Sequence, residues 1–192
     1  MKTSLGQFKE KLFGLGHISD ESWSAFASCL SPKSFVKGQN LVEFGAIEDY
    51  IYYILTGAVK VYVPHKDKEI CTNFRFDNQF TSSVTSFIER TPSEYTITAL
   101  TDTSTLAFSH DDLTHLYNTY PEINFLGRRV MEQLLIDKRQ RELNFLMLSA
   151  KERYLKMMEE YPKYVQFLTS KNLASYLGIT PESLSRIRGK RR

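Results

Sequence analysis

Polar and charged side chains gather between Thr169 and Arg192, where they could contact an anionic polymer. Residues 149–192 contain ten Lys or Arg and four Glu, which gives a net charge of +6. The whole chain has 25 basic and 22 acidic residues, so residues 1–148 carry a net charge of −3. Basic residues concentrated at one end of a chain whose remainder is acidic suit the neutralisation of nucleic-acid phosphates. A solvated charged tail is the alternative for the final Gly-Lys-Arg-Arg.

Two short helices joined by a tight turn are expected to position these side chains. Thr169 can cap the first helix, and Gly178 allows the positive φ at which that helix must end. Thr180 followed by Pro181 then favours a second helix start. The apolar positions expected to face inward are Leu173, Ala174, Leu177, Leu184 and Ile187. Any small helical hairpin shares this pattern, but the local charge favours a helix-turn-helix whose second helix enters the DNA major groove.

The region before these helices shows a different periodicity. From about residue 34 to residue 108, short apolar segments with a two-residue period alternate with Gly, Pro, Asp and Asn. This pattern predicts an antiparallel double-sheet barrel of the jelly-roll type, preceded by two helices over residues 5–30. The Ser/Thr-rich connection 80–92 is longer than its neighbours. Long ordered connections on a rigid barrel are common ligand sites.

A helix of about 27 residues is predicted from Pro121 to Met147, which is longer than a cover for a small barrel needs to be. Its apolar residues keep a seam-like spacing, so we expect a two-fold dimer through this helix, with packing on its own barrel as the alternative. Ser149 and Glu152 form a capping box that starts a new helix, which predicts a hinge at Leu148–Ser149. The residues assigned to the dimer interface are Ile123, Leu126, Val130 and Leu134.

Composition excludes several other classes. Cys29 and Cys71 are weak evidence for a disulfide and too few for an iron–sulfur cluster. The four histidines lack the spacing of a metal site and no GxSxG motif marks a nucleophile, so we expect no metal, no cofactor and no enzyme activity. No apolar run is long enough to span a membrane and no secretion signal is recognisable, which predicts a cytoplasmic protein.

The order of these elements and two motifs resemble the catabolite-activator (Crp/Fnr) family of bacterial transcription regulators over nearly the whole chain. The segment IYYILTGAVKV (51–61) looks like the barrel signature, and LASYLGITPESLSRI (173–187) looks like the DNA-reading signature. The resemblance implies an α+β fold with a cyclic-nucleotide-binding-like double-stranded β-helix, or jelly-roll, sensor domain (1–120). A long dimerisation helix and hinge (121–148) and a helix-turn-helix domain (149–192) would follow. It also implies a homodimer on a pseudo-palindromic double-stranded DNA operator, with RNA polymerase as a further partner.

The same resemblance assigns residues of the helix-turn-helix to DNA. Glu182 and Arg186 match the pair that reads base edges in this family, where a carboxylate can accept from cytosine and a guanidinium can donate twice to guanine. Pro181 replaces a frequent arginine, and the chain ends before the usual β-hairpin wing, so most of the wing is expected to be missing. The full set of expected DNA contacts is Ser170, Lys171, Thr180, Pro181, Glu182, Ser183, Ser185, Arg186, Arg188, Lys190 and Arg191.

The expected effector pocket departs from the family. Relatives that bind cyclic nucleotides carry a Gly-Glu step and then an Arg-Ser step, where this chain has Ser82-Ser83 and Ser93-Glu94. We therefore expect an effector other than cyclic AMP or cyclic GMP, or a constitutive DNA binder. A ligand-sensing adaptor that acts on a protein partner through a vestigial helix-turn-helix is the other alternative. The candidate pocket residues are Tyr62, Ser82, Ser83, Ser93, Glu94, Tyr95, Ile136 and Asp137.

Overall fold

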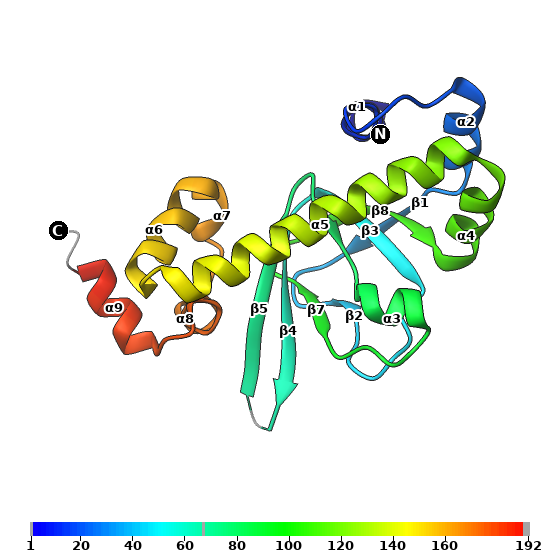
Figure 1. The fold of residues 1–192 in the computed structure, drawn as a ribbon. Helices are drawn as coiled ribbons and strands as arrows, with labels where there is room; N and C mark the ends of the chain where they lie inside the picture. The colour runs from blue at the N-terminus through cyan, green and yellow to red at the C-terminus, as the bar shows by residue number, and fades with distance from the viewer. Residues whose placement is uncertain (1, 67, 190–192) are drawn as a thin grey trace.

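The computed structural model describes residues 2–66 and 68–189, and it has a mixed α+β architecture (Figure 1). Two helices, α1 (Lys2–Phe13) and α2 (Asp20–Ser28), come first, as the sequence predicts. Ser19 caps α2 because its hydroxyl oxygen accepts a hydrogen bond from the Ser22 N–H. Phe8 of α1 is fully buried, and its ring centroid lies 4.5 Å from that of Tyr53, so α1 closes one end of the β domain.

Eight strands of the described chain form two antiparallel sheets of four strands each, in the orders β1-β8-β3-β6 and β2-β7-β4-β5. Ile54, Val59 and Ile97 are fully buried between these sheets. The predicted double-sheet antiparallel domain is therefore confirmed as a β-sandwich. The strand bounds are β1 (Ser31–Phe35), β2 (Asn40–Val42), β3 (Tyr50–Thr56), β4 (Ala58–His65), β5 (Lys68–Phe76), β6 (Phe80–Thr81), β7 (Thr96–Ala99) and β8 (Thr103–Ser109).

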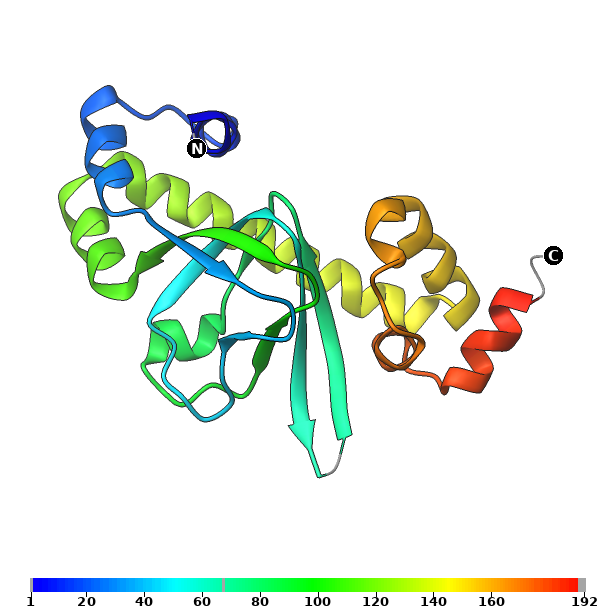
Figure 2. The same ribbon diagram turned by 180° about the vertical axis from the view of Figure 1, so that it is seen from behind.

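Three helices interrupt or follow the strands. The connection 80–92 contains a short helix, α3 (Val84–Glu89), and the last strand leads into α4 (His110–Thr119) and α5 (Pro121–Met147). The bounds of α5 are those predicted. Gly127 lets α5 approach α4 closely, since a Cβ there would lie 2.2 Å from the Tyr117 hydroxyl oxygen. Helix α5 crosses the sandwich and reaches the C-terminal helices (Figures 1 and 2).

The C-terminal helices are α6 (Ala150–Glu160), α7 (Pro162–Val165), α8 (Ser170–Leu177) and α9 (Pro181–Gly189). Both hydrogen bonds of the predicted capping box between Ser149 and Glu152 are present. Leu173, Leu177 and Leu184 are fully buried, which confirms the predicted inward face of α8 and α9. Helix α7 begins at Pro162, because proline is tolerated in the first turn of a helix.

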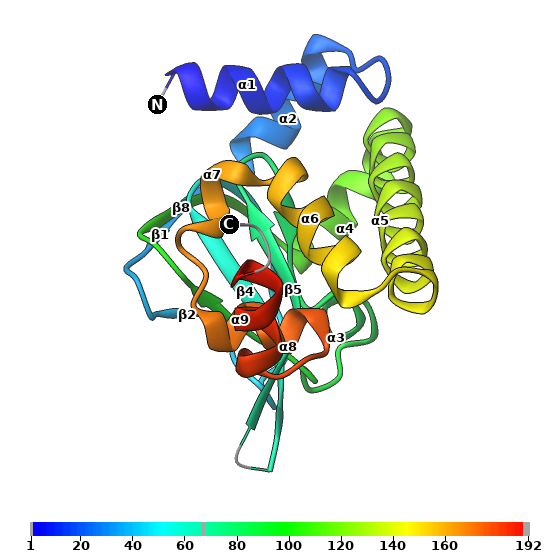
Figure 3. The same ribbon diagram turned by 90° about the vertical axis from the view of Figure 1, so that its left-hand side faces the viewer.

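The C-terminal helices share an apolar cluster with the β4–β5 hairpin (Figure 3). Phe74 and Phe76 of β5 pack with residues of α6 to α9, and the ring of Phe76 stacks on that of Tyr164 at 4.3 Å. No helix within the described ranges is long and apolar enough to cross a membrane. The structure thus consists of a β-sandwich, a long crossing helix and a helical unit docked on one sheet edge.

Candidate functional site

The segment from α8 to α9 forms two capped helices around a left-handed turn. Thr169 caps α8 by accepting a hydrogen bond from the Asn172 N–H at 3.1 Å, and Gly178 ends α8 with a φ of +70°. Thr180 caps α9 through the Ser183 N–H at 3.2 Å. All three roles agree with the predictions from the sequence. They fix the direction in which α9 leaves the turn.

Helix α9 lies on the side of α8 away from the β4–β5 hairpin, at the edge of the molecule (Figures 1 and 2). Glu182, Ser185 and Arg186 are exposed, and Arg186 donates a hydrogen bond to the Ser183 hydroxyl oxygen at 2.8 Å. The pKa of Glu182 is lowered by its own backbone N–H, then by the Thr180 hydroxyl, because the start of a helix favours a negative charge.

The structure brings together most of the residues expected to contact DNA. Arg188 on α9 donates a hydrogen bond to the Ser170 hydroxyl oxygen on α8 at 3.0 Å, which joins the far end of α9 to the start of α8. Lys171 and Pro181 are exposed. Lys190 and Arg191 lie outside the described residues. The expectation about a missing wing concerns the chain beyond Gly189 and also falls outside them.

One arginine joins this unit to the end of α5. The guanidinium of Arg153, on α6, donates hydrogen bonds to the carbonyl oxygens of Phe145 at 3.2 Å and of Leu177 at 2.8 Å, and also bonds the carbonyl of Leu148. It also lies 4.4 Å from the centroid of the Phe145 ring. The carbonyls of Phe145 and Leu148 lie at the end of α5, and that of Leu177 lies at the end of α8. Arg153 therefore supplies hydrogen-bond donors to the C-terminal carbonyls of two helices.

The contact between α8 and β5 is polar as well as apolar. The Ser175 hydroxyl oxygen accepts a hydrogen bond from the Cys71 N–H and donates one to the Glu69 carbonyl. An ion pair also joins Lys163 of α7 to Asp77, the residue after β5, at 2.8 Å. Partial burial raises the pKa of Asp77, but hydrogen bonds, with that from Lys163 first, outweigh it and hold this pKa below its usual value. Cys71 and Cys29 are both free thiols, so no disulfide joins them.

A groove of about 720 Å³ runs along α5, between this helix, β5, the region of α3 and the C-terminal helices. Of the expected pocket residues, Ser82, Tyr95 and Asp137 line it. Ser83, Glu94 and Tyr95 line a smaller cavity of about 260 Å³ beside α3. The predicted pocket is therefore divided between two cavities.

Three expected pocket residues line neither cavity, which corrects their assignment. The hydroxyl of the buried Ser93 bonds the backbone of Tyr95, where it stabilises a turn. Ile136 is 60% exposed on α5. The amino group of Lys60 lies 4.3 Å from the centroid of the Tyr62 ring. Sequence position alone did not show which way these side chains point.

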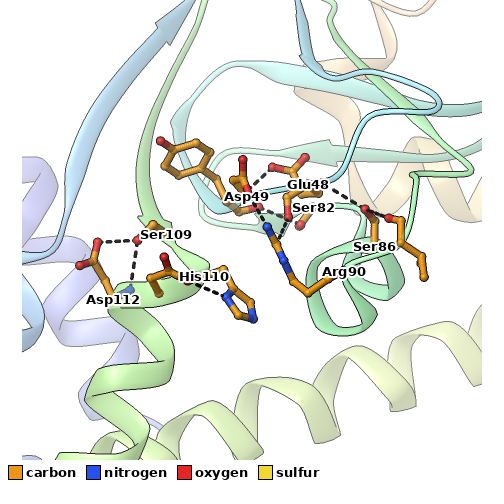
Figure 4. Close-up of polar contacts among 11 residues, drawn as sticks. Glu48, Asp49, Ser82, Ser86, Arg90, Ser109, His110 and Asp112 are labelled. Atoms are coloured by element: carbon orange, nitrogen blue, oxygen red, sulfur yellow. Dashed lines mark hydrogen bonds and ion pairs between the residues drawn. The ribbon is translucent and has the colours of Figure 1, made fainter.

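A polar network beside α3, shown in Figure 4, was not predicted from the sequence. Arg90, in a left-handed conformation with a φ of 55°, donates a hydrogen bond to the Glu48 carbonyl at 2.6 Å and pairs with the Asp49 carboxylate. The Ser86 hydroxyl accepts from the Glu48 N–H at 2.9 Å. Arg90 lines neither cavity. Arg90, the one arginine of the 80–92 connection, is therefore bonded to the loop at Glu48 and Asp49.

Glu48 itself is 5% exposed, and its carboxylate accepts a hydrogen bond from the Tyr50 N–H at 2.8 Å. Burial raises the pKa of Glu48 to about 7, against the lowering effect of that hydrogen bond. No signal in the sequence marks Glu48 as buried, since it follows an Ile and precedes an Asp in an irregular segment.

The expected dimer interface needs a correction. Ile123 and Leu126 are only 2% and 4% exposed and lie in the core of the same protomer, with the helices at the end of the sandwich. They are therefore not available to a second chain. Val130 and Leu134 are half-buried and line the groove. The large apolar side chains that α5 leaves exposed are Phe125, Met131, Leu135, Ile136, Phe145, Leu146 and Met147.

Comparison with known proteins identifies a family for the β-sandwich part of the chain. The sequence model of the cyclic nucleotide-binding domain family matches residues 32–120. This range includes all strand residues of the β-sandwich except Ser31, the first residue of β1. No curated protein sequence matches the chain.

Solved structures of regulators share the fold over most of the chain. The c-di-GMP responsive global regulator CLP of Xanthomonas campestris is 17% identical with a TM-score of 0.69, covering 90% of this chain and 91% of that one. FixK2 of Bradyrhizobium japonicum is 19% identical with a TM-score of 0.70, covering 84% and 83%. The catabolite activator protein of Thermus thermophilus is 17% identical with a TM-score of 0.56, covering 90% and 83%. Residues 32–120 thus match the cyclic nucleotide-binding domain family, and the chain resembles regulators of the Crp/Fnr family, with which it shares its fold.

Proposed function

We propose that the chain is a homodimeric, sequence-specific DNA-binding transcription regulator of the Crp/Fnr type. The observation that carries this proposal is the pair of capped helices α8 and α9, joined through Gly178, with an exposed polar and basic face on α9. In this proposal residues 1–120 form the sensor domain, 121–148 the dimerisation helix and hinge, and 149–192 the helix-turn-helix domain.

The contacts to DNA divide into two kinds. Glu182 and Arg186 are exposed one helical turn apart on α9, where they read base edges in the major groove. Lys171 and Arg188 contact phosphates, which position the protein without reading sequence. The hydrogen bond from Arg188 to Ser170 supports this division, because it places a guanidinium beside the exposed start of α8. A helix start also favours an anion.

The dimer forms through the exposed apolar face of α5. Leu135 and Ile136 are 69% and 60% exposed, and Met131 lies one turn before Leu135. Large apolar side chains on one helix of a water-exposed surface favour association, and a two-fold axis along α5 pairs the same surface on both copies. Two recognition helices must lie about 34 Å apart to enter successive major grooves, and this is the separation that the proposed dimer has to provide.

The effector is not cyclic AMP or cyclic GMP. Ser82-Ser83 and Ser93-Glu94 replace the Gly-Glu and Arg-Ser steps, so these positions offer no carboxylate for the sugar and no guanidinium for the phosphate of a cyclic nucleotide. Arg90 is bonded to Glu48 and Asp49 instead. The exposed carboxylate of Glu94 lines the small cavity and repels a phosphate. Micromolar binding of either nucleotide in calorimetry would contradict this part of the proposal.

Selection of bound sequences from random double-stranded DNA tests the function as a whole. The expected result is an approximately palindromic site with half-sites one helical turn apart. The affinity for this site is expected to fall steeply with salt, because phosphate contacts release counterions. If no sequence is enriched and no salt-dependent binding is seen, the proposal is wrong, and an adaptor that acts on a protein partner replaces it.

A further inference from the structure

One end of the groove along α5 is bordered by three separate parts of the molecule. Arg75 enters it from β5, Arg141 from the second half of α5, and Tyr161 and Tyr176 from the C-terminal helical unit. Figure 1 shows this place, where the second half of α5 passes beside β5 and reaches α6 and α8. A volume of about 720 Å³ for the whole groove is in the range of small-molecule sites.

Arg75 is a half-buried cation without a partner at contact distance. Within residues 2–66 and 68–189, its guanidinium makes no ion pair within 4.0 Å and no hydrogen bond. Burial lowers its pKa, and Asp137 opposes this effect only at longer range. The Asp137 carboxylate is itself bonded to the Gln133 side chain at 2.9 Å. Removing a cation from water is costly unless an anion approaches it.

Arg141 is the second cation, and its neighbour is the aromatic ring of Tyr176 rather than a carboxylate. Its guanidinium lies 4.9 Å from the centroid of the Tyr176 ring, and its Nε atom is buried without a hydrogen-bond partner. The charge of Arg141 lowers the pKa of Arg75, so the two guanidinium groups repel one another across the groove. Two arginines that face one cavity and leave donors unused suit a ligand with several anionic oxygens.

The other charged groups that line the groove form no ion pair with Arg75 or Arg141 in the described part of the chain. Of the carboxylates, Glu160 is 3.7 Å from the Lys156 amino group, and neither it nor Glu142 forms an ion pair with Arg75 or Arg141 in the described chain. The remaining charged group lining the groove is Lys138. The walls between these charges combine apolar side chains, such as Leu134 and Met157, with amides such as Gln79.

We propose that this end of the groove binds a small organic anion, with a phosphate or carboxylate between Arg75 and Arg141 and a flat apolar body against Tyr161 and Tyr176. An anion there would connect β5, α5 and the C-terminal helices at once. Its consequence for DNA binding rests on the proposed function, whereas binding itself does not. The site is separate from the smaller cavity beside α3, because none of these four residues lines that cavity.

Calorimetry on the intact chain without DNA tests the site with simple probes. Phenyl phosphate and phenylacetate carry both an anionic group and a flat body, while inorganic phosphate and phenol carry one each. At least one of the two complete probes is expected to bind about tenfold more tightly than either fragment, and the tighter of them identifies the head group. If neither complete probe binds more tightly than inorganic phosphate and phenol, or if neither complete probe binds at all, the proposal is overturned.

Variants assign the binding to the two arginines. Arg75→Met and Arg141→Met keep the length of the side chain and remove the charge, and each is expected to weaken the complete probe at least about tenfold. Arg139→Met is the matched control, because Arg139 is exposed on α5 and does not line the groove. Its affinity is expected to equal that of the unchanged protein. Unchanged affinity in both test variants overturns the site.

Two further measurements separate this proposal from others. Circular dichroism checks that each variant is folded, and Arg75→Lys, which keeps the charge but loses the planar fork, is expected to retain part of the affinity. Binding of DNA is measured separately, with and without the probe. If the probe binds but no DNA does, the proposed function is contradicted and the anion site is retained. If DNA binds but the probe does not, only the anion site is contradicted.

Discussion

The hydroxyl oxygen of Ser175 in α8 accepts a hydrogen bond from the backbone N–H of Cys71 in β5 at 2.9 Å. Strand β5 is the last strand of its sheet, so this N–H belongs to an open edge. Unpaired groups on a sheet edge invite other chains to pair with them, and a covering helix prevents this. The first helix of the proposed helix-turn-helix therefore also protects the edge of the β-sandwich, and the domains are joined by specific hydrogen bonds.

Ser175→Ala is expected to loosen this contact. The substitution leaves the Cys71 N–H and the Glu69 carbonyl without their partner, which costs about 1–3 kcal/mol where the groups remain buried. Hydrogen exchange at residues 69–73 should accelerate, and the free energy of unfolding should fall. Ser185→Ala, at an exposed position of α9, is the control and should change neither quantity. Unchanged exchange in Ser175→Ala would mean that the contact does not hold the domains together.

Arg186→Ala should relax sequence specificity at one base pair by about 1–3 kcal/mol, because a bidentate guanidinium contact to a base edge is lost. Lys171→Ala should weaken binding to all sequences alike and reduce the salt slope by about one. Quantitative binding to the selected site, to single-base variants and to random DNA measures both effects. Equal loss on specific and random DNA for Arg186→Ala would contradict its role as a base reader.

The pH dependence of stability should carry a contribution from Glu48. Burial raises its pKa to about 7 in the folded chain, above the usual value of 4.5, so the folded state binds this proton more tightly than the unfolded state. The free energy of unfolding therefore loses a contribution as pH rises from about 4.5 to about 7, of roughly 3–4 kcal/mol at most. Glu48→Gln should flatten the curve in that window, whereas Glu43→Gln, at an exposed position, should not.

Gly178→Ala should destabilise the C-terminal unit for two separate reasons. The φ of +70° is unfavourable for a residue with a side chain, and a Cβ would lie 2.6 Å from the Cζ atom of Phe145. The expected loss is about 1–3 kcal/mol in denaturant unfolding. Gly38→Ala is a matched control, since it also has a positive φ but meets no atom within 4 Å. A Gly178 variant no less stable than the Gly38 variant would exclude the contact with Phe145.

Local features were predictable from the sequence because they depend on neighbouring residues. The caps at Thr169 and Thr180, the capping box at Ser149 and the turn at Gly178 all follow from side-chain and backbone chemistry within four residues. The alternation of strands and turns likewise predicted the antiparallel sheets, as the period of two reflects burial of one face. The bounds of α5 followed from Pro121 and the apolar spacing.

Features that depend on distant parts of the chain were not predictable. Apolar spacing shows that Ile123 and Leu126 are covered but not by what, and their own protomer covers them. Arg90 reads as a free cation in the sequence, yet it is bonded to the loop at Glu48 and Asp49, about 40 residues earlier. The pairing of Ser175 with β5 is a further example, because no local pattern marks a serine that caps a sheet edge.

The bonds of Arg153 have a mechanical consequence. One guanidinium on α6 joins the carbonyls of Phe145 and Leu148 at the end of α5 to that of Leu177 at the end of α8. Bending the chain at Leu148–Ser149 would break charge-assisted hydrogen bonds, which are about twice as strong as neutral ones. We therefore expect a rotation of α5 to move α8 with it, and we expect the neutral hydrogen bonds between α8 and β5, where Ser175 meets Cys71, to break before those of Arg153.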